Sequence, residues 1–493
     1  MWIIPILAIG LLLLRCIYRL YLHPLSKIPG PKLAAVTRLP EFYHDVIRGG
    51  KYLWQVEKMH KKYGPVVRIN PNQVHVNDPS FYSEICASGG RKRDKSLTSV
   101  GGFGLSEALP SIVDHDHHSR RRKQLNPAFS KKAIVEILPL VQQKVGLVAE
   151  HVEAAYHGEN DGIVDLDAEF TGLAADTVTQ YTFGKDLGFL KDTNFNNVIT
   201  ASMREMTDQF HLNRFFPWLP GFLQRLPSFF ICWLRPNLAG INALQDRLHQ
   251  VSETKVGGVR TVIDILNDPS LPAEARAPEF IRDNVNLILG AASDPTSGTL
   301  LIGLYHLVQR PPLWLQLRDE LRGVMPSPMS PAPWLELEQL PLLRAVVNEM
   351  LRLSPGTIRI ARVPVSETLV CHGHVIPPGS IVSSSARLIH MHPDPFPDPE
   401  SFNPHRWLEA SPEQLTNMSQ ALIPFSRGSR NCIGHYLATA QIYMLLATVI
   451  RRFDLELHNT SPKNVEFARD CVIARPEKGD WSVKARVVGI ATH

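Results

Sequence analysis

Residues 425–434 (FSRGSRNCIG) hold a single cysteine between two glycines, directly before an apolar segment. Glycine lets the backbone approach a bulky group closely or adopt a positive φ angle. If the apolar segment is a helix, Cys432 lies at its N-terminus, where backbone N–H groups and the helix dipole favour a thiolate. Arg430, two residues earlier, is placed to pair with a carboxylate. These residue types predict that Cys432 is a thiolate ligand beside a bulky group.

The same ten residues match the haem-binding signature of the cytochromes P450, FxxGxRxCxG, at all five defining positions: Phe425, Gly428, Arg430, Cys432 and Gly434. The loop thus resembles that of a haem-thiolate enzyme. The resemblance implies that Cys432 is the fifth ligand of the iron of haem b, with Phe425, Arg430 and Gly434 against the haem. A thiolate ligand pushes electron density onto iron and favours O–O cleavage. The alternative is a buried structural cysteine, and four further segments in the expected order argue against it.

Two of these segments resemble the structural network that supports the loop in this family. Glu349 and Arg352 match the motif ExxR, and their spacing puts both side chains on one helical face, where they can share a buried ion pair. Arg406, within the segment FNPHRW, resembles the third member of the Glu-Arg-Arg network. Here His405 replaces the usual Glu and Trp407 the usual Phe. The resemblance implies that the three network residues hold the loop and do not react.

The other two segments resemble family elements that bind the haem propionates. His118 stands where tryptophan is usual in a WxxxR pair, and Arg122 follows four residues later on the same helical face. In the stretch RLSPGTIRIAR, the last arginine, Arg362, resembles a second propionate-binding residue. Thr357 and Ile358 would then face the substrate. For the remaining arginines of the first segment, a solvated basic helix face is an equally good interpretation.

Residues 280–310 form the longest helical pattern, and its centre resembles the family segment A/G-G-x-D/E-T-T/S. Asp294 fills the acidic position, which implies a role in proton delivery. Pro295 takes the place of the threonine in that pattern. Since proline has neither a hydroxyl nor an N–H, it removes the helical hydrogen bond to the Ala291 carbonyl and is expected to kink the helix. Ala291 is expected to line the substrate pocket.

The proline leaves three accounts of proton delivery. Thr296, Ser293 or an ordered water could replace the missing hydroxyl, although Thr296 lies about 100° further around the helix and needs a local distortion to reach the same place. A hydroxyl of the substrate could supply the path instead. The third account is a haem-thiolate isomerase or dehydratase that does not use O₂. We favour the first two accounts, with Asp294 and Thr296 as catalytic residues.

The N-terminus is almost wholly apolar, and its first basic residues are Arg15 and Arg19. If both arginines extend to the interface, about 20 residues are available to cross a bilayer core of roughly 30 Å. A cleaved signal peptide would show a basic leading region and a small-residue cleavage site, and neither is visible. We predict a membrane anchor at residues 1–22, a proline-rich hinge at 23–32 and a haem-thiolate catalytic domain at 33–493, which the basic residues after the apolar run place on the cytosolic side.

The composition argues against several other classes of protein and kinds of site. The chain has 493 residues, is 44% hydrophobic and carries a net charge of +5, too small a surplus to indicate nucleic-acid binding. Six cysteines without a CxxC pair argue against a zinc site or a disulfide framework. The basic run at residues 91–95 is interpreted as a solvated loop.

Helical patterns dominate the chain, with short strands near 64–76 and 359–385. The predicted fold class is therefore mainly α with a minor β region. The resemblance implies the cytochrome P450 fold after an N-terminal transmembrane helix.

The resemblance also implies a function. A haem-thiolate monooxygenase would insert one oxygen atom from O₂ into a lipophilic small molecule, with electrons from an NADPH-dependent reductase in the same membrane, the endoplasmic reticulum. The N-terminal sequence is similar to that of fungal microsomal members, such as trichodiene-oxygenase-like enzymes, that oxidise terpenoid, polyketide or alkaloid intermediates. The alternative from a different class is a non-catalytic haem-binding protein, which reductase-supported turnover would distinguish.

Overall fold

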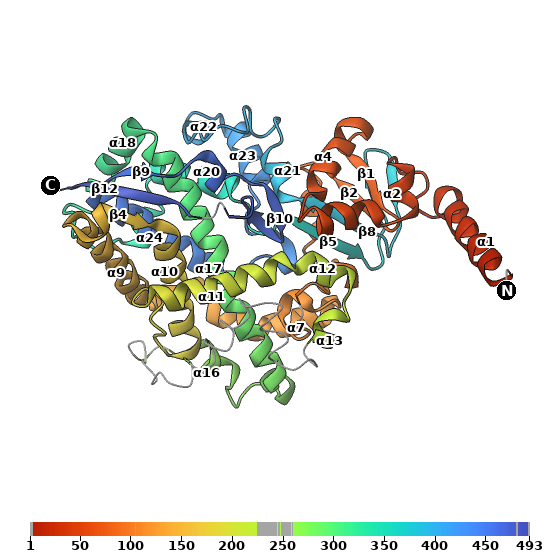
Figure 1. The fold of residues 1–493 in the computed structure, drawn as a ribbon, viewed down its shortest axis with the longest axis horizontal. Helices are drawn as coiled ribbons and strands as arrows, with labels where there is room; N and C mark the ends of the chain where they lie inside the picture. The colour runs from red at the N-terminus through yellow and green to blue at the C-terminus, as the bar shows by residue number, and fades with distance from the viewer. Residues whose placement is uncertain are drawn as a thin grey trace.

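The computed structural model describes residues 3–103, 105–223, 244, 247, 258, 260–479 and 482–491. The described chain is mainly helical with four small sheets, as predicted. Figure 1 shows one long helix, α17, passing through the middle of the body, while the N-terminal helix α1 projects away from it. The positions of α17 and of the helix after Cys432 decide where the candidate site lies.

Helix α17 (Pro278–Val308) begins with a proline at its first position and continues without a break through Pro295. It packs against α10 (Leu166–Phe183), α20 (Pro341–Leu353) and α24 (His435–Arg452). The chain does not become coil after α17, because Pro311 starts the next helix, α18 (Pro311–Arg322). Proline is tolerated there since the first N–H groups of a helix have no partner inside it.

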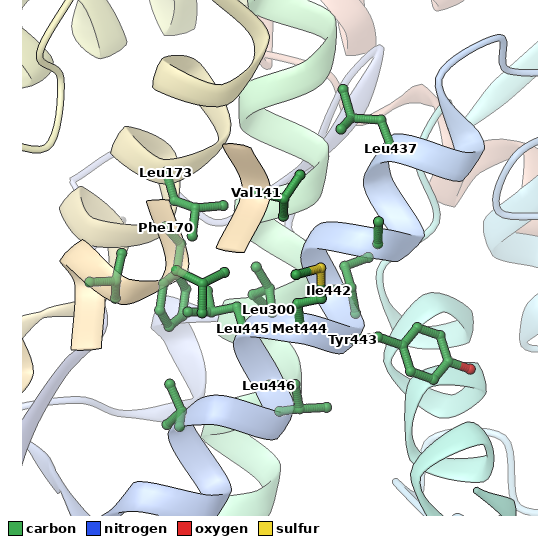
Figure 2. Close-up of a cluster of buried hydrophobic side chains, with 14 of the residues drawn as sticks. Val141, Phe170, Leu173, Leu300, Leu437, Ile442, Tyr443, Met444, Leu445 and Leu446 are labelled. Carbon is green, nitrogen blue, oxygen red and sulfur yellow. The ribbon is translucent and has the colours of Figure 1, made fainter. Parts of the chain in front are cut away.

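The hydrophobic core lies where α9 (Leu138–Tyr156), α10, α17 and α24 meet. Figure 2 shows Phe170 of α10 and Leu300 of α17 beside Met444 and Leu445 of α24. Each fully buried side chain of this size contributes about 1.5–3 kcal/mol of transfer free energy. Because α24 follows the loop with Cys432 directly, this core fixes the position of that loop.

The largest sheet has the strand order β1-β2-β8-β5-β3, in which β2 and β8 pair in parallel and the other neighbours are antiparallel. The first two strands form an antiparallel hairpin where short strands were predicted, near residues 64–76. A second sheet has the order β4-β12-β9, and the remaining strands form two hairpins, β6-β7 and β10-β11. The strands are β1 Val66–Asn70, β2 Gln73–Val76, β3 Arg93–Asp94, β4 Ile163–Asp165, β5 Arg359–Pro364, β6 Leu369–Cys371, β7 His374–Ile376, β8 Ile381–Ser385, β9 Phe453–His458, β10 Arg469–Cys471, β11 Ile473–Arg475 and β12 Lys484–Ile490.

The remaining α-helices surround this framework. They are α2 Lys32–Val36, α3 Leu39–Phe42, α4 Tyr52–Tyr63, α5 Tyr82–Cys86, α6 Leu97–Val100, α7 His115–Leu125, α8 Lys131–Glu136, α11 Thr193–Asp208, α12 Phe210–Phe215, α13 Leu219–Leu223, α16 Val262–Leu266, α19 Trp334–Leu337, α21 Ala386–His390, α22 His405–Leu408 and α23 Pro412–Ala421. Residues 131–156 are divided between α8 and α9, because Pro139 restarts the helix after Glu136.

The N-terminal helix runs from α1 (Ile3–Ile17) into a π-helical turn at Tyr18–Leu22. The 20 residues Ile3–Leu22 have a mean hydropathy of 2.1 and none of them is buried, so the segment is a candidate membrane span. The guanidinium of Arg19 donates to the Val36 carbonyl of α2. Its own carbonyl accepts a hydrogen bond of 2.7 Å from Arg68. These contacts join the C-terminal end of this candidate span to the body.

Candidate active site

Residues 425–434, the ligand loop, are shaped by close backbone approaches. Gly428 has a φ of +73°, and a Cβ atom there would clash with the backbone carbonyl oxygens of Cys86 and Ala87 at the end of α5. Only glycine fits this position without distortion. The backbone N–H of Cys432 donates to the Phe425 carbonyl at 2.8 Å, which closes the loop. A Cβ at Gly434 would meet no atom within 4 Å, so the loop leaves open space beside the cysteine.

Two arginines hold the ligand loop from outside. Arg430 is buried and donates to the carbonyls of Ile112 and Val113, both at 2.7 Å, just before α7. Arg122, from α7 itself, donates to the carbonyl and the side-chain oxygen of Asn431 at 2.5 and 2.6 Å. Helix α7 is therefore tied to the residue that precedes Cys432 in the chain.

The thiol of Cys432 has accessible surface although protein surrounds it. Burial raises the pKa of this thiol, and the backbone N–H of Gly434 and the charge of Arg122 only partly oppose that rise. The N–H groups at the N-terminus of α24 lower the pKa as the sequence predicts, but burial has the larger effect. A metal ion bound to the sulfur would favour the thiolate over the thiol, since a coordinated thiol is deprotonated. The sulfur is suited to be a ligand of a group held inside the protein.

Five basic side chains gather beside this loop: Lys95, His118, Arg122, Arg362 and Arg430, here called the cation cluster. Burial, followed by repulsion from Arg362, lowers the pKa of Arg430, although two nearby aspartates oppose this. Burial and the neighbouring cations also lower the pKa of Lys95 well below its usual range and that of His118 to about 2. The side chains around the cation cluster thus supply too little negative charge to balance its positive charges.

Three nitrogen atoms of the cluster are buried without a hydrogen-bond partner among the described residues: Nδ1 of His118, Nε of Arg362 and Nε of Arg430. Buried polar groups in proteins are nearly always hydrogen-bonded. Unpaired donors of basic side chains beside the exposed Cys432 therefore fit an iron porphyrin, whose two carboxylates would receive these donors.

The sequence argument missed Lys95 as a member of the cluster. The basic run at 91–95 was expected to be a solvated loop; Lys92 is exposed as expected, but the expectation is wrong for Arg93 and Lys95. Arg93 is only 1% exposed and Lys95 donates to the Pro110 carbonyl at 2.6 Å. No local pattern distinguishes an inward-facing lysine from a solvated one, because the neighbouring cations come from α7, β5 and the ligand loop.

The Glu-Arg-Arg residues meet as a buried network behind the site. Arg352 donates to both carboxylate oxygens of Glu349 at 2.9 and 2.7 Å, and both side chains are fully buried. Nε of Arg406 lies 3.2 Å from Glu349. Trp407 adds a contact that the motif did not predict, because its indole N–H donates to Glu349 at 2.9 Å. The replacement of the usual Phe by Trp thus gives this carboxylate a further donor.

On α17, Asp294 is buried and its carboxylate accepts a hydrogen bond from Arg475 of β11. Nε of Arg204, on α11, lies 3.7 Å from the other carboxylate oxygen. Burial alone would raise the pKa of Asp294, but Arg475 and Arg204 hold it below its usual value. Sequence reasoning found the acid and missed both arginines, which come from distant parts of the chain.

The hydroxyls around Pro295 differ in their hydrogen bonding. Ser293 donates to the Leu289 carbonyl at 2.9 Å, and Thr299 donates to the Pro295 carbonyl at 2.9 Å. Thr296 is buried, and its hydroxyl makes no hydrogen bond within the described part of the chain. Ser293 and Thr296 are the two side chains that could replace the hydroxyl of the missing threonine. The Ser293 hydroxyl already donates a hydrogen bond to a backbone carbonyl, whereas the Thr296 hydroxyl makes none within the described residues.

The three residues expected in the substrate pocket occupy different surroundings. Thr357 and Ala291 are exposed, although residues on either side of each are buried or half-buried. Ile358 is fully buried, in a hydrophobic cluster with residues such as Tyr52 and Leu388. The structure thus packs the Ile358 side chain against a hydrophobic cluster, and its contact with substrate stays a prediction.

Comparison with known proteins agrees with this arrangement. The cytochrome P450 family model matches residues 31–483. The chain is 40% identical over 505 residues to the cytochrome P450 monooxygenase aflU of Aspergillus parasiticus, with 98% of each chain covered. It is 38% identical to the cytochrome P450 monooxygenase TRI4 of Fusarium sporotrichioides, over 94% of this chain and 90% of the relative. It is also 38% identical to the conidiogenone synthase PchP450 of Penicillium rubens, over 97% and 96%.

The family match spans nearly the whole chain, and the relatives match it from end to end. The family uses a haem iron with a cysteine thiolate ligand, O₂, a lipophilic substrate and a redox partner. The ligand loop, the cation cluster and the buried network fit that cofactor. The chain belongs to the cytochrome P450 family and is a haem-thiolate monooxygenase.

Proposed function

We propose that this enzyme inserts one oxygen atom from O₂ into a lipophilic intermediate of fungal secondary metabolism. The cited relatives are fungal enzymes, and one of them is named for a product, conidiogenone. A terpenoid, polyketide or alkaloid skeleton fits this class, since it offers unactivated C–H bonds or double bonds. The observation that carries the proposal is the accessible Cys432 thiol beside the unpaired donors of the cation cluster.

We assign Cys432 as the iron ligand and haem b as the cofactor. The cation cluster, including Lys95, would receive the two propionates, since its donors are unpaired and its charges repel one another. Phe425 and Gly434 would line the proximal face, because one closes the loop around Cys432 and the other leaves open space beside it. When bound, the haem supplies oxygen activation, while the protein supplies the ligand, orientation and a proton path.

For the distal side, we assign proton handling to Asp294 and Thr296. Conversion of O₂ to one inserted oxygen atom and one water consumes two protons and two electrons. Thr296 has the uncommitted hydroxyl beside Pro295, and Asp294 is the buried acid two residues earlier. Ala291 and Thr357 are the two proposed pocket residues with accessible surface.

We further propose that the body lies on the cytosolic face of the endoplasmic reticulum and receives electrons from an NADPH-dependent reductase. The unburied Ile3–Leu22 helix would cross the membrane once, and contacts such as that of Arg19 with α2 would hold the body near it. Removing residues 1–22 should release the protein from membranes while leaving the haem spectrum unchanged. Retention of the truncated protein in the membrane fraction would contradict the single anchor.

The test is turnover by the purified full chain with reductase, NADPH and isotopically heavy O₂. Candidate lipophilic substrates are first selected by the change they cause in the absorption spectrum of the ferric haem. The expected product contains one heavy oxygen atom, and the variant Cys432→Ser forms none. A product formed from a bound substrate without NADPH or O₂ would instead establish an isomerase or dehydratase.

A further inference from the structure

The turn between β6 and β7 brings a cysteine and a histidine beside an aspartate from a distant part of the chain. Cys371 ends β6, His372 is the first residue of the turn, and Asp78 lies in the loop after β2. The sulfur of Cys371, a ring nitrogen of His372 and a carboxylate oxygen of Asp78 all lie within 4.8 Å of one another. Thiol, imidazole and carboxylate are three of the groups that bind metal ions in proteins.

The geometry of the turn explains how two neighbouring side chains reach the same place. Neighbours in a strand point to opposite faces of the sheet. Cys371 pairs with His374 across the hairpin, so the loop consists of His372 and Gly373 alone. Both have positive φ angles, +47° and +76°, as a type I′ turn requires. Asparagine, aspartate or glycine usually fills the first position, so the turn itself does not account for a histidine there.

Asp78 directs one carboxylate oxygen to this group, because the other oxygen is held elsewhere. Its Oδ1 accepts hydrogen bonds from the backbone N–H and the hydroxyl of Ser80, at 2.8 and 2.7 Å. Its Oδ2 accepts a hydrogen bond of 2.8 Å from Nε2 of His372, 294 residues away in the chain. Hydrogen bonds of the kind that Ser80 makes fix the orientation of a carboxylate that binds a metal ion.

The group lies between the interior and the solvent. Cys371 is 3% exposed and packs in a hydrophobic cluster with residues such as Val76 and Ile85. The side chains of His372 and Asp78 are 49% and 20% exposed, so an ion can reach them from water. Burial, followed by the charge of Asp78, raises the pKa of the Cys371 thiol to about 12. An ion that binds the sulfur must therefore displace its proton, as metal ions do.

We propose that Cys371, His372 and Asp78 bind a zinc ion, with water as the fourth ligand. Zinc takes sulfur, imidazole nitrogen and carboxylate oxygen in tetrahedral sites, at about 2.0–2.3 Å. A tetrahedron of that size separates the ligand atoms by roughly 3.3–3.8 Å. The sulfur would thus move inward, and the contact between His372 and Asp78 would open by less than about 1 Å. The thiol gives one proton to water, the histidine proton moves from Nε2 to Nδ1, and nothing is oxidised or reduced.

Zinc at this place joins the β6-β7 hairpin to the segment that leads into α5. The carbonyl oxygens of Cys86 and Ala87, at the end of α5, closely approach Gly428 of the ligand loop. The ion thus supports the ligand loop from outside the haem site. The absence of paired cysteines in the sequence does not bear on this site, since folding brings its ligands together. The proposal is independent of the reaction at the haem, so its failure would leave the proposed function unchanged.

The first test measures zinc binding by the haem-loaded full chain after treatment with a chelator. Competition with a fluorescent zinc indicator should show one tightly bound ion per chain. X-ray absorption at the zinc edge should show one sulfur neighbour at about 2.3 Å and nitrogen or oxygen neighbours at about 2.0–2.2 Å. Cys432 does not compete for zinc, because the haem iron engages it in this form.

Three variants locate the ion. His372→Asn should lose the tight binding and keep the hairpin, because asparagine suits the left-handed position in this turn. Cys371→Ser should remove the sulfur neighbour from the zinc spectrum. The matched control is His374→Asn, since His374 lies on the same hairpin but outside the group, and it should bind zinc as the native chain does. Zinc bound without a sulfur neighbour, or equally well by His372→Asn, would mean adventitious binding and overturn the proposal.

The second test measures amide hydrogen exchange in residues 369–376, which reports local opening of the hairpin. Zinc should slow this exchange in the native chain and in His374→Asn, and the effect should be lost in His372→Asn and Cys371→Ser. The carbon monoxide spectrum should be the same in all of them. No change in the native chain, or an equal change in every variant, would show that zinc does not join these two segments.

Discussion

The two sides of the proposed haem site differ in how closely they follow the family pattern. On the side of Cys432, the signature positions are present, and Gly428 and Arg430 are held by short backbone approaches and hydrogen bonds. On the side of α17, a proline replaces the hydroxyl residue, and arginines outside the motif hold the acid. The difference has a physical reason. A sulfur ligand must lie at one fixed position relative to the metal, whereas a proton path can be formed by different sets of hydroxyl groups and water molecules.

The largest expected effect is on the cysteine side. In Cys432→Ser the strongly red-shifted carbon monoxide band of the reduced protein should disappear and monooxygenation should stop, because an alcohol oxygen does not replace the thiolate. The difference spectrum with and without carbon monoxide measures this. A red-shifted band that survives the substitution would mean that another group is the ligand.

Next in size is the loss of the buried network. Glu349→Gln leaves the fully buried Arg352 without an ionised partner and should cost about 3–5 kcal/mol of unfolding free energy. Haem content and chemical denaturation of the purified protein measure the loss. The control is Asp319→Asn, since Asp319 and its partner Arg322 are 67% and 51% exposed, and should cost less than about 1 kcal/mol. Equal losses in both variants would show that Glu349 has no special structural role.

The cation cluster should affect cofactor retention. Lys95→Met removes a cationic donor expected to bind a propionate, and a charge-assisted hydrogen bond contributes about 1.5–3 kcal/mol. Haem should therefore leave the protein roughly tenfold to a hundredfold faster, as measured by transfer to an excess of another haem-binding protein. Lys92→Met is the control, because Lys92 is exposed and pairs with Asp116. Unchanged haem loss in Lys95→Met would remove this residue from the proposed haem site.

On the side of α17, the Thr296 hydroxyl should contribute to the coupling of NADPH consumption to product formation more than its position in the motif suggests. Thr296→Val keeps the shape of the side chain and removes the uncommitted hydroxyl. Product formed per NADPH should fall by about tenfold or more, with the balance appearing as hydrogen peroxide, because proton delivery is impaired. Ser293→Ala should change coupling less, since that hydroxyl is bonded to the Leu289 carbonyl. The reverse order of effects would exchange the roles of the two residues.

The smallest expected effect is that of restoring the family residue. Pro295→Thr should leave activity similar or raise coupling, because α17 is already continuous through this position and gains a hydroxyl. Combined with Thr296→Val, it should recover part of the lost coupling. Complete loss of product with the haem retained would indicate that the proline serves a chemistry of its own.

The ligand loop and the Glu349–Arg352 pair could be predicted from the sequence because their determinants are local. The spacing between Gly428 and Cys432 and that between Glu349 and Arg352 are read directly along the chain. The helix boundaries near Pro278 and Leu353 also follow from proline and apolar periodicity. The sequence could not predict that Lys95 faces inward, since no local pattern marks it, nor that Ile358 packs in a hydrophobic cluster with Tyr52 and Leu388.

The sequence by itself determined the family and the membrane-compatible helix and predicted the iron ligand, since each depends on residue types at fixed spacing or on a continuous apolar run. Only the tertiary structure decided which charged side chains surround Asp294 and Lys95. It placed Arg475 and Arg204 on Asp294, and Lys95 among four other cations. The physical reason is that the charge around a buried group is a sum over residues close in space, and those residues lie far apart along the chain.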